Sequence, residues 1–411
     1  MVKVCDAIMG TGKSSAAITY MNEHSDERFI YITPYLDEAA RIKNQCPACN
    51  FVEPSDKLRK YNYKKSLHTA ALISQGKNIT TTHQAFRSYT NDMLLDIKKY
   101  GYNLIVDENV EVLEAYDLHP DDLKLTVDGG YVQYNNGAYS LTGKAYDGAA
   151  MRDLFNMMKS RSLISVQDGD SSLFYWALPP ALITSFKSVF VLTYLFSGQS
   201  FHHFLEIYDI PYEYIGIEKQ PDGTFRFGEY PGYTPSYVSN LRDKLHIYYG
   251  DKLNEIGDEY YAMSLSWFER GGDEVEQLKK NVYNFFRNIC GSTAADRLWG
   301  SYKVGLYKIR GKGYSNAFLN FNAKATNKYR DRNTLVYASN VFMNVREKTF
   351  YQMYGIEVDE DIYALSIMVQ WIWRSAIRDG EDVTIYIPSR RMRTLLENWI
   401  DSLSEGGNAD V

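Results

Sequence analysis

Ala7-Ile8-Met9-Gly10-Thr11-Gly12-Lys13-Ser14 follows a short apolar run, Val2–Cys5, and precedes a stretch with helical spacing, Ala16–Met21. This order predicts a strand, a glycine loop and a helix. Such a loop points backbone N–H groups at a phosphate, and the helix N-terminus adds partial positive charge. Lys13 is expected to reach the β- and γ-phosphates, and the Ser14 hydroxyl to hold Mg²⁺. The alternative is an ordinary turn rich in small residues.

The glycine loop departs from the strict phosphate-loop pattern at one position, because Ala7 stands where Gly is expected. Glycine at positions 10 and 12 permits backbone angles and close approaches that a Cβ would block. We therefore predict that a nucleotide is bound by seven residues of this segment: Met9, Gly10, Thr11, Gly12, Lys13, Ser14 and Ser15.

The composition is that of a globular protein, with 411 residues, 45% hydrophobic and 23% charged. This length is enough for two or three domains. No apolar run approaches the roughly 20 residues that span a membrane. The glycine loop begins close to Met1, so we expect no signal peptide and a cytoplasmic location. The net charge of −6 means that a nucleic acid would have to bind local basic patches.

Cysteine is rare, with four residues in the chain, which suits a reducing cytoplasm. Cys46-Pro-Ala-Cys49 has the spacing of half a zinc site, but the sequence holds no second pair. We expect free thiols, with a structural zinc as the alternative.

A second strong signal is the apolar run Tyr102–Val106, which ends in Asp107-Glu108. Asp107 is expected to bind Mg²⁺ through water, and Glu108 to orient and activate the water that attacks the nucleotide. An Asp-Glu pair after a strand means little alone. Together with the glycine loop it predicts a nucleoside triphosphatase.

Two further β-rich runs end in small polar residues, Thr33-Pro34-Tyr35 and Thr82-His83-Gln84. Ligands of α/β sheets gather at the carboxyl ends of strands, so both segments are expected on the functional edge. Thr82, His83 and Gln84 offer hydroxyl, imidazole and amide groups for phosphate contacts. The alternatives are a strand-to-helix turn without a ligand for the first segment and a structural histidine for the second.

Residues 111–180 do not fit a minimal motor core. Short runs at 124–127, 131–134 and 138–141 predict strands of a small β-meander, followed by a helix around 149–160. We interpret the segment as an insertion, either a contact to DNA or a partner, or a structural addition. Proline and glycine are concentrated between 210 and 236, which predicts a linker at 216–240 between a domain at 1–215 and another at 241–411.

Residues 301–350 hold ten Lys or Arg against two acidic residues, with aromatic residues between them. This combination is typical of single-strand binding, in which cations meet phosphates and rings stack on bases. The alternative is a solvated basic face with aromatic residues in the core.

A third strong signal is Gln370-Trp-Ile-Trp-Arg374-Ser-Ala-Ile-Arg378. A helix here would place Gln370, Arg374 and Arg378 near one face, since residues four apart are neighbours. An arginine on that face can stabilise the charge of a transferring phosphoryl group. We favour Arg378 as this arginine finger, with Arg374 as the second candidate and an ordinary surface helix as the alternative.

Together with two further segments, these stretches resemble, in chain order, motifs I, Ia, Ib, II, III, V and VI of the superfamily 2 DNA helicases. Their sequences are similar to those of the compact helicases of tailed bacteriophages. Ser188–Phe196 is similar to motif III, and Ala325–Arg332 to motif V. The resemblance covers about residues 1–110, 185–215 and 300–390. It implies that DNA is contacted by residues of motifs Ia, Ib and V: Thr33, Pro34, Tyr35, Thr82, His83, Gln84, Thr326 and Asn327.

The resemblance implies an α/β fold of two RecA-like domains with parallel sheets, ATP and Mg²⁺ in the cleft between them, and DNA across the opposite edge. The expected catalytic residues are Lys13, Asp107, Glu108, Gln370, Arg374 and Arg378. The implied function is an ATP-dependent helicase or translocase in phage replication or recombination, with replication proteins as further partners. Six residues precede Ala7, so no adenine-reading Q motif is expected. Two alternatives are an ATP-switched remodelling protein without strand separation and a terminase-type packaging motor.

Overall fold

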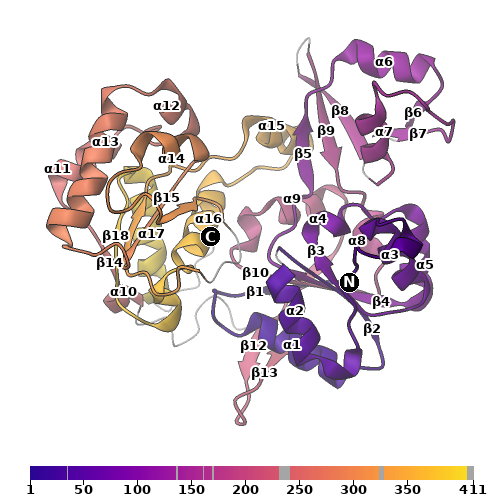
Figure 1. The fold of residues 1–411 in the computed structure, drawn as a ribbon, viewed down its shortest axis with the longest axis horizontal. Coiled ribbons are helices and arrows are strands. Elements are labelled where there is room, and N and C mark those ends of the chain that lie inside the picture. The colour runs from indigo at the N-terminus through magenta and orange to yellow at the C-terminus, as the bar shows by residue number, and fades with distance from the viewer. Residues whose placement is uncertain are drawn as a thin grey trace. The chain divides into compact units, whose positions relative to one another are not determined.

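The computed structural model describes residues 1–34, 36–135, 138–160, 162–168, 171–230, 241–323 and 328–404. The chain forms two compact units (Figure 1). Unit 1 comprises Met1–Tyr230 and Asn344–Val358, and unit 2 comprises Pro231–Met343 and Asp359–Val411. The return of Asn344–Val358 to unit 1 was not expected from the sequence.

Unit 1 is built on a six-stranded sheet in the order β11-β1-β10-β4-β2-β3, and all its neighbouring strands are parallel. The strands are almost continuously apolar because helices cover both faces of such a sheet. Their bounds are β1 (Val2–Asp6), β2 (Arg28–Thr33), β3 (Ile79–Thr82), β4 (Tyr102–Asp107), β10 (Ser188–Thr193) and β11 (Tyr212–Tyr214).

The helices of unit 1 pack on this sheet. Ala17 and Met21 of the first helix lie in one core cluster with Cys5, Phe29 and Phe190 of the strands. The bounds of the helices are α1 (Lys13–Glu23), α2 (Leu36–Gln45), α3 (Lys65–Ser74), α4 (His83–Phe86), α5 (Asn91–Tyr100), α8 (Ala181–Thr184) and α9 (Ser200–Ile207), with 3-10 turns η1 (Pro47–Cys49), η2 (Arg59–Tyr61) and η3 (Phe196–Gly198).

The segment expected to be a linker holds ordered structure. After β11, the chain forms an antiparallel hairpin of β12 (Gly216–Lys219) and β13 (Phe225–Gly228), and this hairpin belongs to unit 1. The rest of the expected linker, 231–240, lies outside the described residues.

The insertion forms an antiparallel sheet in the order β5-β9-β8-β7-β6. The predicted strands near 131–134 and 138–141 are present, but the strand predicted at 124–127 is wrong, because these residues lie in a helix. Pro120 at its first turn and buried Leu123 and Thr126, three residues apart, favour that helix. The bounds are β5 (Leu113–Tyr116), α6 (Pro120–Asp128), β6 (Val132–Asn135), β7 (Ala138–Leu141), α7 (Arg152–Met158), β8 (Ser162–Asp168) and β9 (Ser171–Ala177).

The two faces of the insertion sheet are covered by different parts of the chain. Phe174 and Trp176 of β9 lie in a core cluster with residues of α6 and α7. Tyr175 points to the other face, since side chains alternate along a strand. There it packs against Phe350 of α15 (Val345–Met353), and its hydroxyl donates to the Arg346 carbonyl at 2.8 Å. The returning segment therefore completes the insertion.

Unit 2 has a five-stranded sheet in the order β14-β18-β17-β15-β16, and all neighbours are parallel. The strands are β14 (Leu245–Ile247), β15 (Arg297–Ser301), β16 (Phe318–Asn320), β17 (Thr334–Tyr337) and β18 (Val383–Tyr386). The predicted α/β fold with two parallel-sheet domains and a small insertion in the first is confirmed.

The helices of unit 2 include a π-helical continuation of α13. Their bounds are α10 (Leu241–Lys244), α11 (Asp251–Asn254), η5 (Glu255–Gly257), α12 (Leu265–Arg270), α13 (Asp273–Asn284), η6 (Phe285–Ile289), α14 (Lys303–Ile309), α16 (Glu360–Ile372), η7 (Ala376–Asp379) and α17 (Arg390–Ser404).

The aromatic residues of the basic stretch 301–350 are mostly part of the core. Tyr314 and Tyr329 are buried, and Tyr302 and Phe321 are half-buried with ring centroids 4.4 Å apart. Tyr307 is the exception, with 71% of its surface exposed. The alternative interpretation of these rings, as core residues, therefore describes most of them better than a base-stacking surface does.

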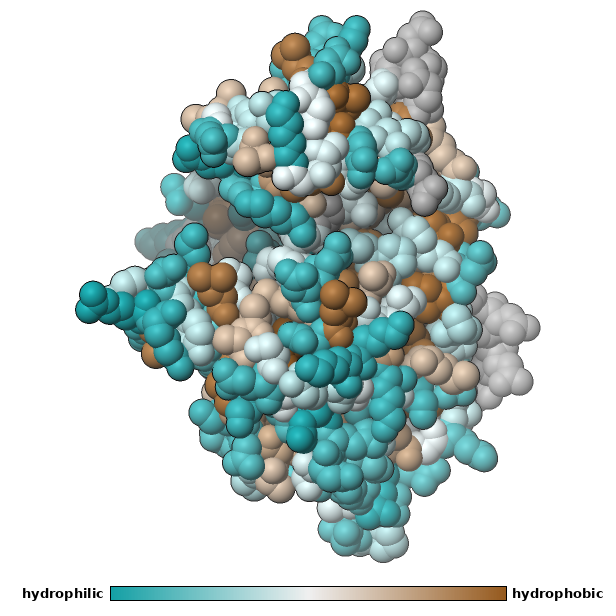
Figure 2. Space-filling model, turned by 90° about the vertical axis from the view of Figure 1, so that its right-hand side faces the viewer, coloured by the Kyte–Doolittle hydropathy of each residue, from teal (hydrophilic) through white to brown (hydrophobic). Residues whose placement is uncertain are grey.

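The surface in Figure 2 shows hydrophobic residues scattered among hydrophilic ones. Across the part of the chain that the structure describes, every helix is too short or too polar to cross a membrane.

Candidate nucleotide and nucleic-acid sites

The glycine loop (Ala7–Gly12) joins the end of β1 to the start of α1. Gly10 and Gly12 have φ values of 86° and 96°, in the left-handed region that favours glycine. Gly12 caps the N-terminus of α1, so the first N–H groups of the helix face the loop. Backbone donors and helix charge thus converge where the sequence predicted a phosphate.

Lys13 spans the loop with its ammonium group. Its Nζ donates to the carbonyls of Ala7 and Ile8, the latter at 3.0 Å. Burial lowers the pKa of Lys13, while the negative charges of Asp6, Asp107 and Glu108 oppose this shift. A cation that is desolvated in this way gains from an anion placed beside it, which is the environment that a phosphate would supply.

Ser14 and Asp107 lie together although 93 positions separate them. The Ser14 hydroxyl donates to Oδ1 of Asp107 over 3.5 Å. The sheet order explains this, because β10 lies between β1 and β4 and all three strands end at one edge. A hydroxyl and a carboxylate at this spacing are oxygen ligands of the kind that Mg²⁺ prefers.

The Asp107 carboxyl is held in an environment that disfavours its charge. Burial raises its pKa to about 7, and the neighbouring carboxylates of Glu108 and Glu38 add to the shift. A divalent cation would reverse this effect, since it stabilises the ionised carboxylate. The residues present therefore fit Mg²⁺ with a bound nucleotide.

Glu108 has a φ of 63°, unusual for a residue with a side chain. Its backbone N–H donates to the Leu192 carbonyl of β10 at 3.0 Å, which holds the turn after β4. Strained backbone of this kind is often found at functional sites, where it aims a side chain. The strain supports a functional position for Glu108.

Three residues of this site were missed by the sequence analysis: Asp6, Tyr31 and Glu38. Tyr31 of β2 is fully buried, and burial raises its pKa well above its usual value, with the nearby carboxylates of Asp107 and Glu38 adding to the shift. Asp6 accepts the Phe196 N–H at 3.0 Å, which ties the end of β1 to the turn after β10. Asp6 could have been predicted as a site residue from the sequence, because it directly precedes the glycine loop.

The motif III segment is held by a buried side-chain network. Thr193 donates through Oγ1 to Gln199 Oε1 at 2.8 Å, and Gln199 Nε2 donates to the Tyr194 carbonyl at 2.7 Å. The Ala7 N–H also donates to the Thr193 carbonyl at 3.0 Å. The turn after β10 and the glycine loop are therefore directly bonded.

The first predicted DNA-contacting segment is only partly available to a ligand. The Thr33 side chain is fully buried, so direct contact of its hydroxyl with DNA conflicts with the structure. Its burial follows from its position as the last residue of a central strand. Pro34 is half-buried, and Tyr35 lies outside the described residues.

The second segment, Thr82-His83-Gln84, begins helix α4 at the end of β3. The Thr82 hydroxyl accepts the Ala85 N–H at 3.3 Å and so caps this helix. His83 is half-buried and Gln84 is exposed. Gln84 is thus the most accessible candidate of this group, while Thr82 has a structural role. Thr326 and Asn327 lie outside the described residues.

The helix predicted through Gln370, Arg374 and Arg378 is wrong beyond its first half. Helix α16 ends at Ile372, and Arg378 lies in the separate 3-10 turn η7. The chain leaves the helix because Ser375 is extended and the Ala376 N–H donates to the Arg332 carbonyl at 2.8 Å.

The three residues consequently differ in exposure. Gln370 is half-buried, Arg374 is 6% exposed, and Arg378 is exposed. They do not form one helical face. Arg378 alone of the two arginines presents its side chain to solvent.

Cys46 and Cys49 are buried free thiols beside α1. The Cys49 thiol donates to the Met21 carbonyl at 3.2 Å. Among the described residues, this pair gathers no third ligand of a metal site. The structure thus describes Cys46 and Cys49 as two buried free thiols.

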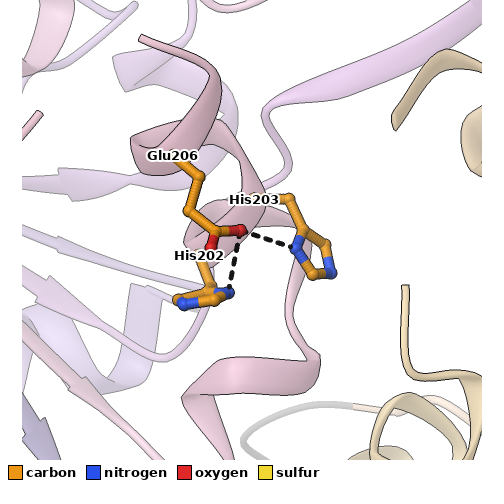
Figure 3. A group of neighbouring side chains, drawn as sticks. All are labelled: His202, His203 and Glu206. Atoms are coloured by element: carbon orange, nitrogen blue, oxygen red, sulfur yellow. Dashed lines mark hydrogen bonds and ion pairs between the residues drawn. The ribbon is translucent and has the colours of Figure 1, made fainter. Parts of the chain in front are cut away.

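One group in the described residues has the composition of a metal site: His202, His203 and Glu206 of α9 (Figure 3). The Glu206 carboxylate lies 3.5 Å from His202 Nδ1 and 3.3 Å from His203 Nδ1. Burial lowers the pKa of both imidazoles, and the Glu206 carboxylate opposes this shift. His202 Nε2 also lies 3.0 Å from the Tyr212 hydroxyl. A hydrogen bond to Glu206 accounts for the position of His203 Nδ1, whereas His202 Nδ1 and His203 Nε2 are buried without a hydrogen-bond partner among the described residues.

The fold and the glycine-loop site define a two-unit α/β protein with a candidate nucleotide site in unit 1. The SPbeta prophage-derived protein YonV of Bacillus subtilis (strain 168) is 38% identical over 413 residues, which cover 98% of this chain and 99% of YonV. The chain therefore belongs to the YonV family. The family model of the YonV C-terminal Rossmann-like domain matches residues 239–400, which span most of unit 2 and also include the segment Asn344–Val358 of unit 1.

Solved structures of XPD helicases are also similar to this chain. An apo XPD structure is 10% identical, with 97% of this chain and 95% of that chain covered and a TM-score of 0.49. Xpd4 of S. tokodaii is 11% identical, with 97% and 94% covered and a TM-score of 0.48. With TM-scores below 0.5, the function has to be argued from the chain's own residues.

Proposed function

We propose that this protein is an ATP-dependent DNA helicase or translocase. The observation that carries the proposal is the convergence of Lys13, Ser14, Asp107 and Glu108 at the carboxyl ends of β1 and β4. A cation, a hydroxyl and two carboxylates beside a loop of backbone donors are the groups that nucleoside-triphosphate hydrolysis needs.

Each group has a distinct role. Lys13 binds the β- and γ-phosphates in place of the loop carbonyls that it now contacts. Ser14 and Asp107 hold Mg²⁺, which neutralises the charge of the phosphates. Glu108 orients water and accepts its proton. We assign the arginine-finger role to Arg378, because its side chain is exposed and that of Arg374 is buried.

The DNA-binding part of the proposal rests on the ordered motifs and on exposed polar groups at the sheet edge, of which Gln84 is the clearest. The prophage origin of YonV supports a role in phage DNA replication or recombination, inside the host cell. The alternative functions are an ATP-switched remodelling protein and a terminase-type packaging motor. Both would use the same unit 1 site, so activity on a forked duplex separates them from a helicase.

The first test measures ATP hydrolysis by the full chain with and without single-stranded DNA, followed by strand displacement from a fork with either 3′ or 5′ tails. We expect Mg²⁺-dependent hydrolysis, stimulation by DNA, and displacement with one polarity. Lys13→Ala should abolish both activities, while Lys3→Ala, a partly exposed lysine of β1 paired with Glu213, should retain them. Hydrolysis without displacement of either fork would favour the remodelling or packaging alternatives.

A further inference from the structure

The hairpin β12–β13 lies beside the glycine loop. Strand β11 is the neighbour of β1 at the sheet edge, and the Ile215 N–H donates to the Val4 carbonyl at 2.9 Å. From there the chain turns into the hairpin, which packs along α1 (Figure 1). The topology explains the position of the hairpin. Strand β11 runs parallel to β1, so the end of β11 lies at the same edge of the sheet as the glycine loop that follows β1.

One cross-strand pair anchors this hairpin in the core. Ile217 faces Phe227 across the two strands, and both pack against the core cluster beneath α1. The Phe227 ring stacks on Phe190, with centroids 5.3 Å apart and planes at 18°. Arg226 also pairs with Glu23 at the end of α1, at 2.5 Å. The hairpin is therefore held in place from both strands.

Two positions further toward the hairpin tip, Lys219 pairs with Phe225, and this pair faces the same side as Ile217 and Phe227. A Cβ built on Gly12 would lie 2.5 Å from Cδ1 of Phe225, so the ring is in contact with the backbone of Gly12. Phe225 is half-buried and is not part of the core cluster that includes Phe227. An aromatic ring with a solvent-accessible surface thus adjoins the glycine loop.

We propose that Phe225 is the base-binding residue of the nucleotide site, and that the nucleobase stacks on its accessible surface. This inference rests on the proposed function. The ribose and base extend from the α-phosphate, which the loop and the first turn of α1 cradle. Aromatic side chains bind bases by stacking, and every base offers a π-face.

The chemistry of phenylalanine also limits the selectivity of this site. Its ring has no hydrogen-bond donor or acceptor with which to read the edge of a base. We therefore expect ATP and GTP to bind with similar affinity, within about fivefold, because stacking is tolerant of base identity. Lys219 adds positive charge on the same face, which favours the triphosphate and not a particular base.

The test compares the full chain with Phe225→Leu, in which an apolar side chain still covers Gly12 but cannot stack. Calorimetric titrations use ATP, GTP and inorganic tripolyphosphate, each with Mg²⁺. Phe225→Leu should bind ATP and GTP roughly tenfold more weakly, which corresponds to the lower range of base stacking, and tripolyphosphate as the unchanged protein does. Phe225→Trp should restore nucleotide affinity. Glu218→Gln, on the opposite face of the hairpin, is the matched control and should change none of the three affinities.

The outcomes separate this inference from the proposed function. Equal ATP affinity in Phe225→Leu and the unchanged protein would overturn the base-binding role. An equal loss for ATP and tripolyphosphate would also overturn it, since Phe225 would then only shape the loop. If the unchanged protein bound neither ATP nor tripolyphosphate, the proposed function itself would fail.

Discussion

The parallel sheets of units 1 and 2 position their candidate residues in different ways. In unit 1, Asp107 ends a buried strand and Glu108 follows it directly, and the sheet brings both residues to Lys13. In unit 2, Gln370 lies in the last turn of helix α16, Arg374 is buried just after this helix, and Arg378 is exposed in the 3-10 turn η7. A strand end at a sheet edge fixes a side chain's position, whereas a helical face exists only as far as the helix continues.

The strongest test of this comparison is Glu108→Gln in unit 1. We expect ATP hydrolysis to fall at least about 100-fold, because the amide cannot accept a proton from water. ATP affinity should stay within about threefold, since Lys13 and Ser14 are intact. Steady-state phosphate release and calorimetry measure the two effects. Glu111→Gln is the control, because this exposed carboxylate pairs with Arg87 outside the loop. An equal loss of ATP hydrolysis in Glu108→Gln and Glu111→Gln would contradict the proposed role of Glu108.

The next test separates the two arginines of unit 2. Arg374→Ala should lower the free energy of unfolding by about 3 kcal/mol, because it removes a buried charged side chain whose partners then lose their contact. Arg378→Ala should change it by less than about 0.5 kcal/mol, as expected of an exposed position.

For ATP hydrolysis, we expect the larger direct effect from Arg378→Ala, the variant with the smaller effect on stability. Arg378→Ala should lower the rate of DNA-stimulated ATP hydrolysis at least about tenfold, as expected for an arginine finger. Denaturant titration and phosphate release give both numbers for each variant. A fully active Arg378→Ala would rule out the finger assignment.

A pH series tests the electrostatics of unit 1 without a nucleotide. Burial raises the Asp107 pKa from 3.8 to about 7, so the folded protein holds this proton more tightly than the unfolded chain does. Asp107 therefore costs stability as the pH rises from about 4 to about 7, by up to about 1.4 kcal/mol per pH unit, and its cost is constant above that.

Asp107→Asn removes this titration, and the other groups cancel in the difference. The variant should gain stability over the unchanged protein between pH 5 and 7, and the gain should level off at higher pH. Thermal unfolding across the series measures the difference. A difference that does not depend on pH would contradict the raised pKa.

The smallest effects are expected at two helix caps, one in each unit. The Thr82 hydroxyl caps α4, and the Asp359 carboxylate caps α16 by accepting the N–H groups of Asp361 and Ile362 at 2.8 and 3.0 Å. Thr82→Ala and Asp359→Ala should each lower the free energy of unfolding by about 1 kcal/mol. Thr82→Ser and Asp359→Asn keep an acceptor and should recover most of it. A larger loss of DNA-stimulated hydrolysis in Thr82→Ala than in Thr82→Ser would show a role beyond capping.

The sequence predicted the parts of the fold that local patterns define. Buried strands such as Tyr102–Asp107 are apolar runs with clear ends, and two glycines before a lysine mark the loop. The end of α16 was not predictable, because the chain leaves the helix through a bond from Ala376 to the carbonyl of Arg332, more than 40 positions away. The burial of Thr33, the place of Tyr31 near Asp107 and that of Phe225 beside Gly12 also depend on contacts between distant segments.

Because Asn344–Val358 belongs to unit 1, the folding of unit 1 during biosynthesis must wait until this segment has been synthesised. At about 5–20 residues per second, a ribosome needs roughly 6–23 seconds to add the 113 residues between Tyr230 and Asn344 (343 − 230). During that interval the nascent unit 1 has its sheets but not α15, so the insertion face around Tyr175 has yet to receive Phe350. Unit 1 can therefore complete its fold only after all of unit 2's first segment, residues 231–343, has left the ribosome.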